Sequence, residues 1–143
     1  MSITTRTVTL NDLDSVYLLV SDLKGHHLDK AAFETTFTKN LSDPNIHYIA
    51  AEKDGLVVGF ASLHVQYILH HTYPTCELQE LVIASDHRSN GIGSILIKEV
   101  ERIACSLTLE EIELTTRTTR EKAQAFYKKL GYEHTHNKFV KKL

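Results

Sequence analysis

The sequence predicts a mixed α/β fold, and three features along its 143 residues support this prediction. Residues 77–83 are too apolar for a surface strand, and a glycine-bearing loop and an amphipathic helix follow them. Upstream, two predicted strands are joined by Asp54-Gly55, a dipeptide that favours a tight hairpin turn. Before the hairpin, apolar residues recur twice at helical spacing. This order of elements indicates one domain over residues 1–143, and by itself it fits several α/β or α+β sheets.

The first half of the chain divides into a strand, two helices and the hairpin. Residues 3–9 alternate β-branched and polar side chains and predict a strand. Asn11 and Asp12 are start signals for a first helix, and Asp29 is expected to cap a second one. The two strands of the hairpin are expected at residues 46–51 and 56–66, and residues 68–74 form an aromatic, histidine-rich loop. The apolar face of the first helix consists of Leu13, Val16, Tyr17, Val20 and Leu23.

The second half continues with a helix, a strand and a last helix. The helix after the glycine loop is expected to bury one apolar stripe, and residues 111–115 predict a further strand. Thr118 and Glu121 have the spacing of a capping box, and Gly131 is expected to end the last helix. One or two short strands are expected in the tail, residues 132–140. The stripe of the long helix consists of Ile92, Leu96, Val100, Ile103 and Leu107.

Composition excludes several classes of function. The net charge is −2 and no basic stripe occurs, so the sequence does not predict binding to nucleic acid. No stretch approaches the length of a membrane span, and the N-terminus lacks the apolar core of a signal peptide. The two cysteines, Cys76 and Cys105, do not form a disulfide framework, and we expect reduced thiols and a cytoplasmic location. Cys76 is expected to be a small buried residue rather than a nucleophile.

The loop at residues 88–93 has the chemistry of a phosphate cradle. A helix N-terminus presents backbone N–H groups without partners at the positive end of the helix dipole. Gly91 and Gly93 allow a ligand to approach the main chain, and Arg88 is expected to add a positive charge there. The loop lacks the third glycine of a dinucleotide site and the lysine of a P-loop.

Arg88-x-x-Gly91-x-Gly93, directly after a strand ending Leu81-Val82-Ile83, resembles the acetyl-CoA signature of the GNAT N-acetyltransferase superfamily. A second stretch, Ala123-x-x-Phe126-Tyr127-x-x-x-Gly131-Tyr132, is similar to the closing motif of that family. The resemblance implies the GNAT fold, a central mixed and mostly antiparallel sheet flanked by about four helices. It also implies acetyl-CoA as co-substrate and direct attack of an amine on the thioester. The residues that it places at the cofactor are Leu81, Val82, Ile83, Arg88, Ser89, Asn90, Gly91, Ile92, Gly93 and Ser94.

Three catalytic residues are expected. Acetyl transfer needs a base for the amine, whose pKa in water is near 10.4, and a carboxylate by the signature strand could serve. Glu77 and Glu80 are the candidates; a regular strand would place them on opposite faces, and a bulge would change this. Glu77 matches the family's strand glutamate and is preferred. Tyr127 matches the family's general acid. Arg120 stands where many members have an asparagine that contacts pantetheine; the role of the asparagine is not transferred to it, and Arg120 could contact the CoA phosphates or the acceptor, or be solvated.

The acceptor is less well defined by the sequence. Residues 42–48, 63–71 and 77–82 look like the corresponding stretches of bacterial aminoalkylphosphonate N-acetyltransferases. That resemblance implies a small aminophosphonate acceptor and a divalent metal, for which Glu77, Glu80 and His64 are weak candidate ligands. A dimer contact is the alternative role for the histidine-rich loop, and a homodimer is expected.

Two other functions compete with this prediction. The same chemistry could serve a polyamine, an aminoglycoside or a peptide amine. Alternatively, the chain could bind acyl-CoA as a regulatory module without turnover, which predicts that the acid and the base are missing. Tyr127, Glu77 and Glu80 are all present, and this favours an enzyme.

Overall fold

The computed structural model describes residues 2–143, which form two compact units. The larger unit ends at Glu113, and the smaller one is Leu114–Leu143. The larger unit contains most of the sheet and three of the four α-helices of the described residues. Its elements are β1 (Thr4–Thr7), α1 (Leu13–Lys24), α2 (Lys30–Leu41), β2 (Ile46–Lys53), β3 (Leu56–Tyr67), β4 (Pro74–Ile83) and α3 (Ile92–Ser106), followed by β5 (Ile112–Leu114) at the boundary. The smaller unit contains α4 (Glu121–Lys129).

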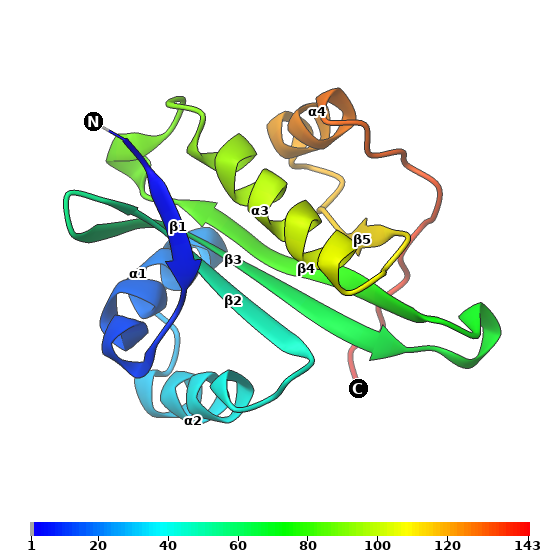
Figure 1. Ribbon diagram of the computed structural model, residues 1–143, viewed down its shortest axis with the longest axis horizontal. Coiled ribbons are helices and arrows are strands. Elements are labelled where there is room, and N and C mark those ends of the chain that lie inside the picture. The colour runs from blue at the N-terminus through cyan, green and yellow to red at the C-terminus, as the bar shows by residue number, and fades with distance from the viewer. Residues whose placement is uncertain (1) are drawn as a thin grey trace. The chain divides into compact units, whose positions relative to one another are not determined.

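The sheet has the order β1-β2-β3-β4-β5, and the pairs from β1 to β4 are antiparallel. In the larger unit α1 and α2 cover one face of this sheet, and α3 covers the other (Figure 1). β4 has a neighbour on both sides, as expected for the strand predicted at residues 77–83. The expected arrangement of a mainly antiparallel sheet with four helices is therefore confirmed.

Both faces of the sheet are closed by apolar packing. On the α1 and α2 face the buried cluster comprises Val8, Val16, Leu19, Phe37, Ala50, Phe60 and Val82. On the other face α3 lies so close to β3 that a Cβ placed on Gly59 would be 3.0 Å from the side chain of Leu96. The glycine therefore sets the distance at which α3 packs.

Three details of the predicted elements are wrong. Thr118 and Glu121 form no capping box, because α4 begins one residue after Arg120, which is its N-cap and makes no side-chain cap. Residues 132–143 contain no strand among the described residues. Leu107 is not part of the α3 stripe: the helix ends at Ser106, and Leu107 is 42% exposed.

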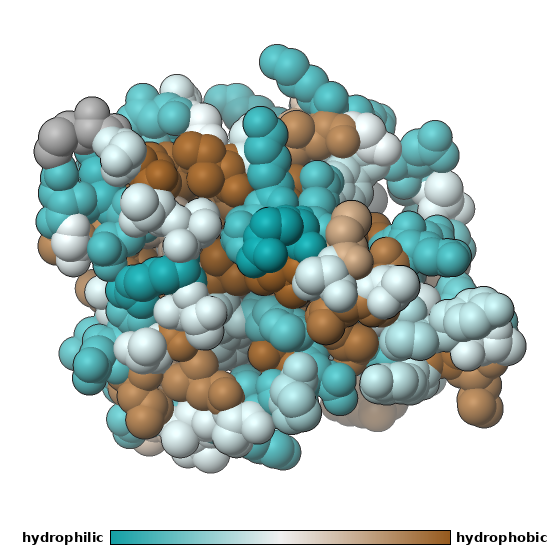
Figure 2. Space-filling model, in the orientation of Figure 1, coloured by the Kyte–Doolittle hydropathy of each residue, from teal (hydrophilic) through white to brown (hydrophobic). Residues whose placement is uncertain are grey.

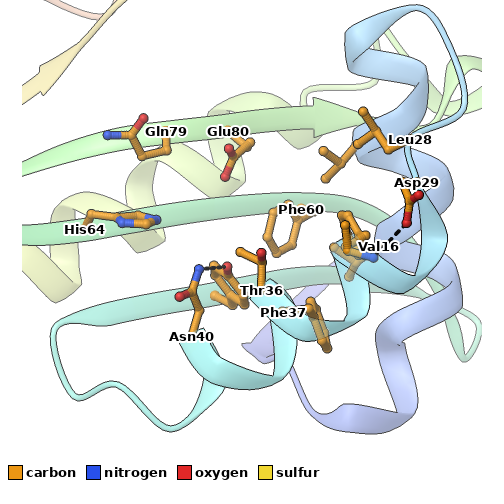
Figure 3. Close-up of a pocket in the computed structure, with 14 residues that line it drawn as sticks. Val16, Leu28, Asp29, Thr36, Phe37, Asn40, Phe60, His64, Gln79 and Glu80 are labelled. Atoms are coloured by element: carbon orange, nitrogen blue, oxygen red, sulfur yellow. Dashed lines mark hydrogen bonds between the residues drawn. The ribbon is translucent and has the colours of Figure 1, made fainter.

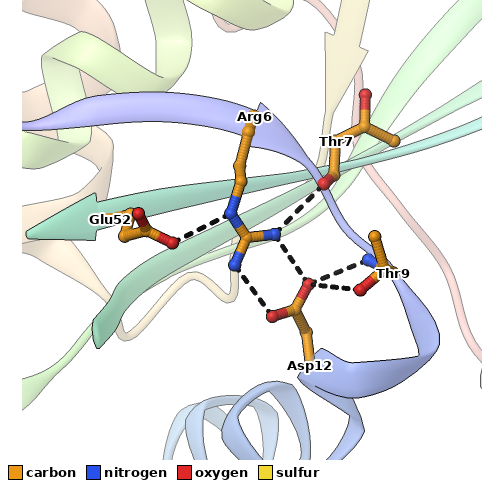
Figure 4. Close-up of polar contacts among 5 residues, drawn as sticks. All are labelled: Arg6, Thr7, Thr9, Asp12 and Glu52. Carbon is orange, nitrogen blue, oxygen red and sulfur yellow. Dashed lines mark hydrogen bonds and ion pairs between the residues drawn. The ribbon is translucent and has the colours of Figure 1, made fainter. Parts of the chain in front are cut away.

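The start of α1 is fixed by an ion-pair network around Arg6 (Figure 4). The Arg6 guanidinium donates two hydrogen bonds to the carboxylate of Asp12, at 2.8 and 2.9 Å, and one to Glu52 at 2.9 Å. Asp12 is almost buried and also accepts from the backbone N–H of Thr9 at 2.8 Å. These hydrogen bonds with Arg6 hold the pKa of Asp12 below its ordinary value of 3.8. The network joins β1, β2 and the entry to α1.

We expect Asp12→Asn to lower the free energy of unfolding by roughly 1.5–3 kcal/mol at pH 7, because Arg6 and Thr9 both lose a charged acceptor. Because the pKa of Asp12 is depressed in the folded state, its carboxylate stabilises the fold fully at pH values above the unfolded-state pKa. This stabilisation is lost as the pH falls below about 3.8 and through the folded-state pKa. Urea unfolding of both proteins at pH 7 and pH 3 measures the difference.

Asp14→Asn is the matched control, because its ion pair with Lys30 is exposed to solvent and should contribute little to stability. Equal losses in the two variants would contradict a structural role for the Arg6 network.

Candidate active site

One extra residue in β4 determines where its two glutamates point. Glu80 pairs with Ser62 on β3, but the next pair along the strands is Leu78 with Leu63. Gln79 is therefore an unpaired bulge residue. Glu77 pairs with His64, which is two residues from Ser62 on β3, so Glu77 and Glu80 lie on the same face of the sheet. The opposite facing expected for a regular strand therefore does not hold, because the bulge that would change it is present.

Glu80 is held by the hydroxyl of Ser62. This serine is fully buried; its Oγ donates to Oε1 of Glu80 and accepts from the Glu80 backbone N–H at 3.1 Å. The same side chain thus binds both the carboxylate and the backbone of the residue after the bulge. Glu77 has a weaker contact, a hydrogen bond from Nε2 of Gln66 at 3.4 Å.

A cavity of about 480 Å³ lies over this part of the sheet, between the strands and helices α1 and α2. Glu80, Gln79 and His64 line it, whereas Glu77 does not. Figure 3 shows Glu80 and His64 on neighbouring strands of its floor, with α2 opposite. The remaining lining residues are Val16, Val20, Leu28, Asp29, Ala32, Phe33, Thr36, Phe37, Asn40, Tyr48 and Phe60. This size and this mostly apolar lining suit a small organic molecule.

The signature loop leads from β4 to the N-terminus of α3. Gly91 is the N-cap of α3 and adopts the left-handed conformation, with φ +77°, and Ser89 also has a positive φ of +67°. These turns present the first N–H groups of α3, those of Ile92, Gly93 and Ser94, at the helix end, which is the arrangement that binds phosphate. Asn90 lies in this loop directly before Gly91, and Leu81 to Ile83 form the end of β4 that precedes the loop.

Arg88 does not point its charge at the helix end. Its guanidinium donates to Oδ2 of Asp22 on α1 at 2.7 Å and to the carbonyl of Ile83 at 3.2 Å. Arg88 and Asp22 are both about half exposed, so this ion pair is weak. In this conformation the free N–H groups at the start of α3, rather than the Arg88 side chain, are the groups available to an anion.

The smaller unit carries the other two predicted residues. Tyr127 lies on α4 and packs edge-on against the rings of Phe126 and Tyr132, with centroids 5.2 and 5.8 Å away. Burial raises its pKa, while the nearby charge of Arg120 partly opposes this rise. The phenol is therefore protonated at neutral pH, as a general acid must be.

Cys76 lies in the core, as expected from the sequence. Cys76 is buried and donates to the carbonyl of Glu111, and burial raises its pKa to about 11, so it is not a nucleophile. Within residues 2–143 no group of three or more His, Cys, Asp or Glu side chains could hold a metal ion. No helix of that range is long and apolar enough to cross a bilayer.

The tip of the β3–β4 hairpin exposes Tyr67, Leu69 and Tyr73, and Figure 2 shows apolar atoms protruding there.

Comparison with known proteins identifies the family. The sequence model of the Acetyltransferase (GNAT) family matches residues 13–132. The chain belongs to the GNAT family. It is also 43% identical over 138 residues to the aminoalkylphosphonate N-acetyltransferase of Salmonella typhimurium, covering 96% of this chain and 90% of that protein. This GNAT protein is thus an N-acetyltransferase, and acetyl-CoA is its acetyl donor.

Solved structures agree with the GNAT fold. A transcriptional regulator from Bacillus halodurans superposes with a TM-score of 0.90 at 23% identity, covering 99% of this chain and all of that one. The aminoglycoside N-acetyltransferase AAC(6')-Iy, solved in complex with CoA, superposes with a TM-score of 0.88 at 20% identity, covering 99% and 95%. At these identities the likeness shows the GNAT fold alone.

Two polar residues of the pocket, Tyr48 and Asn40, and the buried Ser62 beside Glu80 were not predicted from the sequence. The strand register brings Tyr48 on β2 and Ser62 on β3 to the face of the sheet that carries Glu80, and Asn40 comes from α2 on the opposite side of the cavity. A signal for the bulge was present, however. Glu77 and Glu80, like Leu78 and Leu81, are three residues apart within a strand, which breaks the two-residue period.

We expect Gly91→Ala to weaken CoA binding and to lower stability by about 1–2 kcal/mol, because alanine is strained at a φ of +77°. Nothing within 4 Å would contact the new Cβ, so the change acts through the loop backbone. Gly91→Asn is the control, since asparagine tolerates this conformation better. Calorimetric titration with CoA, together with thermal melts, measures both effects.

If a phosphate lies directly against Gly91, both variants should lose affinity while only the alanine variant loses much stability. Unchanged CoA affinity in both would contradict the assignment of this loop to the cofactor.

Proposed function

We propose that this GNAT enzyme transfers the acetyl group of acetyl-CoA to the primary amine of a small aminoalkylphosphonate. The observation that carries this proposal is the 43% identity, over nearly the full length of both chains, to the Salmonella typhimurium aminoalkylphosphonate N-acetyltransferase. The cavity of about 480 Å³ supports it, because that volume suits a small acceptor. A carboxylate and several hydrogen-bonding side chains line this cavity.

In the proposed reaction Glu80 acts as the base, in preference to Glu77. Its carboxylate lines the cavity and is held by Ser62, whereas Glu77 lies outside the lining and contacts Gln66. Glu80 accepts a proton from the ammonium form of the acceptor, directly or through water, and leaves a neutral amine that can attack. Glu77 remains the alternative base, now on the same face of the sheet.

The neutral amine then attacks the thioester carbonyl, a C–N bond forms, and the C–S bond to CoA breaks. Backbone N–H groups at Val82 and Ile83 are proposed to polarise the carbonyl oxygen, and the loop from Arg88 to Ser94 to bind the pyrophosphate. Tyr127 is proposed to give its proton to the departing CoA sulfur, for which its raised pKa keeps it protonated. Arg120 is proposed to contact CoA phosphates or the acceptor. Holding both substrates together could supply roughly 7–11 kcal/mol in favourable cases.

A divalent metal is a further part of the proposal. The described residues that line the cavity include no lysine or arginine, so a phosphonate there has no cationic side chain as partner. The bulge brings Glu80, Glu77 and His64 to one face of the sheet; with Glu80 assigned as the base, the directly paired Glu77 and His64 are the side chains that, together with phosphonate oxygens, could hold Mg²⁺. When bound, the metal would neutralise part of the phosphonate charge.

We also propose that both units act as one domain, in a cytoplasmic homodimer. The family match spans both units, which supports a single functional domain. Both cysteines are free, in keeping with a reducing compartment. The exposed apolar tip of the β3–β4 hairpin is a surface that a second subunit could cover.

Release of the CoA thiol from acetyl-CoA, with 2-aminoethylphosphonate as acceptor, tests the proposal. We expect turnover with this acceptor and stimulation by a divalent cation after chelator treatment. Glu80→Gln should lower kcat/KM by about 100-fold or more, as expected for loss of a general base. Glu77→Gln is the comparison variant; because Glu77 is a candidate metal ligand, it is assayed at saturating divalent cation, where it should lower kcat/KM less than about fivefold.

Turnover of other amines, such as a polyamine or an aminoglycoside, without turnover of the aminophosphonate would replace the proposed acceptor and leave the chemistry intact. Binding of acetyl-CoA without turnover of any amine would favour the regulatory module. A larger loss in the Glu77 variant would return the role of base to that residue.

For the general acid we expect Tyr127→Phe to lower kcat by about tenfold or more while the KM for acetyl-CoA changes little. The variant keeps the ring contacts with Phe126 and Tyr132 and removes only the hydroxyl. Phe126→Leu, which leaves the phenol in place, controls for packing. Steady-state kinetics separates the two parameters, and unchanged kcat would exclude the acid role.

A further inference from the structure

Three polar residues form a row across the sheet, and the two at its ends, Tyr48 and Glu80, line the cavity. Tyr48 on β2 pairs with Ser62 on β3, and Ser62 pairs with Glu80 on β4. Directly paired residues of neighbouring strands share a face, so all three side chains project toward α1 and α2. Adjacent strands are about 4.8 Å apart, which places the backbones of Tyr48 and Glu80 roughly 10 Å apart. Ser62 is fully buried between them, whereas Tyr48 and Glu80 both line the cavity, so a short molecule in the cavity can reach both side chains.

The hydroxyl of Tyr48 is oriented as a donor. The side-chain amide of Asn40, on α2, donates to the Tyr48 oxygen at 2.7 Å, and Figure 3 marks this bond from Asn40. An oxygen that accepts this bond still has its own O–H proton to donate. Among the described residues no acceptor for that proton is found, and Tyr48 lines the cavity. Burial raises the pKa of Tyr48, the hydrogen bond from Asn40 partly opposes this rise, and the charge of Glu80 adds to it, so the phenol keeps its proton at neutral pH.

The two carboxylates of the cavity differ in their availability. Asp29 caps α2 and accepts from the Ala32 N–H at 2.8 Å. Glu80 is held by Ser62 through one oxygen, Oε1, and its other oxygen can face a ligand. The cavity thus has an acceptor of hydrogen bonds on β4 and a donor on β2.

We propose that Tyr48, oriented by Asn40, binds the acidic group of the acceptor molecule while Glu80 faces its amine. This inference rests on the proposed function and deepens it, because it assigns the residues that select amines bearing an acid. The orientation follows from the chain: the signature loop continues from the end of β4, so the reacting amine belongs on the β4 side. The acidic end then lies toward β2. Asn40 acts as a positioning residue, and Tyr48 contacts the substrate.

The test compares two acceptors in the wild type and in Tyr48→Phe. One is 2-aminoethylphosphonate, and the other is propylamine, which has no acidic group. A lost hydrogen bond to a charged group should lower kcat/KM for the aminophosphonate by roughly tenfold or more, mainly through KM, and leave propylamine nearly unchanged. Asn40→Leu should give a smaller change of the same kind. Phenylalanine keeps the packing of Tyr48 against Phe37 and Phe60.

Thermal melts and a matched variant separate specificity from damage to the fold. Tyr17→Phe removes a phenol of α1 that binds the Leu28 carbonyl, outside the row, and should keep the wild-type preference between the two acceptors. Equal losses for both acceptors in Tyr48→Phe would overturn the inference while the proposed function stands. A wild type that turns over propylamine but not the aminophosphonate would overturn both. An unchanged preference in Tyr48→Phe, with the aminophosphonate still the better substrate, would overturn the inference alone.

Discussion

The bulge at Gln79 is the constraint on which the acceptor side of this site depends. Before the bulge, Leu78 faces α3 through its pairing with Leu63, and after it Leu81 faces the same way beside Ala61. Leu78 and Leu81 are three residues apart, so a regular strand could bury only one of them on that face. The extra residue lets the strand keep both leucines in the core under α3.

The bulge also keeps a charged glutamate side chain out of the core. Without the bulge, Glu80 and Glu77 would lie on opposite faces, and one of the carboxylates would point into the apolar layer beneath α3, at a cost of several kcal/mol for an unpaired charge. With it, both project toward the cavity side, and the buried hydroxyl of Ser62 binds the carboxylate and the backbone N–H of Glu80. The bulge therefore determines both the packing of the two leucines on one face of β4 and the position of the two glutamates on the other.

How far the sequence predicts this molecule depends on whether a feature is local. The strands, the helices and the loop from Arg88 to Gly93 are encoded in short stretches with period, turn and capping signals, and these were found. The strand register joins residues far apart in sequence, and a single inserted residue shifts it without changing composition. Tyr48, Ser62 and Asn40 therefore could not be grouped before the fold was known. The predicted capping box failed for a related reason: Thr118 and Glu121 have the right spacing, but α4 begins after Arg120.

The sequence also did not predict the direction of the Arg88 side chain. Arg88 stands at the expected position of the signature, yet its guanidinium reaches Asp22 on α1 and the Ile83 carbonyl. The ion pair links the loop to a helix that lines the acceptor cavity, and solvent weakens it because both partners are half exposed. The proposed phosphate site then consists of main-chain N–H groups at the start of α3, where Gly91 is the N-cap with a φ of +77°.

Neutral donors in the cavity are compatible with a carboxylate base in a way that cations are not. A lysine or arginine beside Glu80 would bind an acidic substrate group strongly, but it would also stabilise the ionised carboxylate and weaken it as a proton acceptor. It would further tend to form an ion pair with Glu80 and occupy the space between β2 and β4. A phenol oriented by an amide, as in Tyr48 and Asn40, offers a hydrogen bond without a charge. Under the proposed assignment, Tyr48 binds an acid at one end of the cavity and Glu80 deprotonates an amine at the other, and the two groups do not neutralise each other.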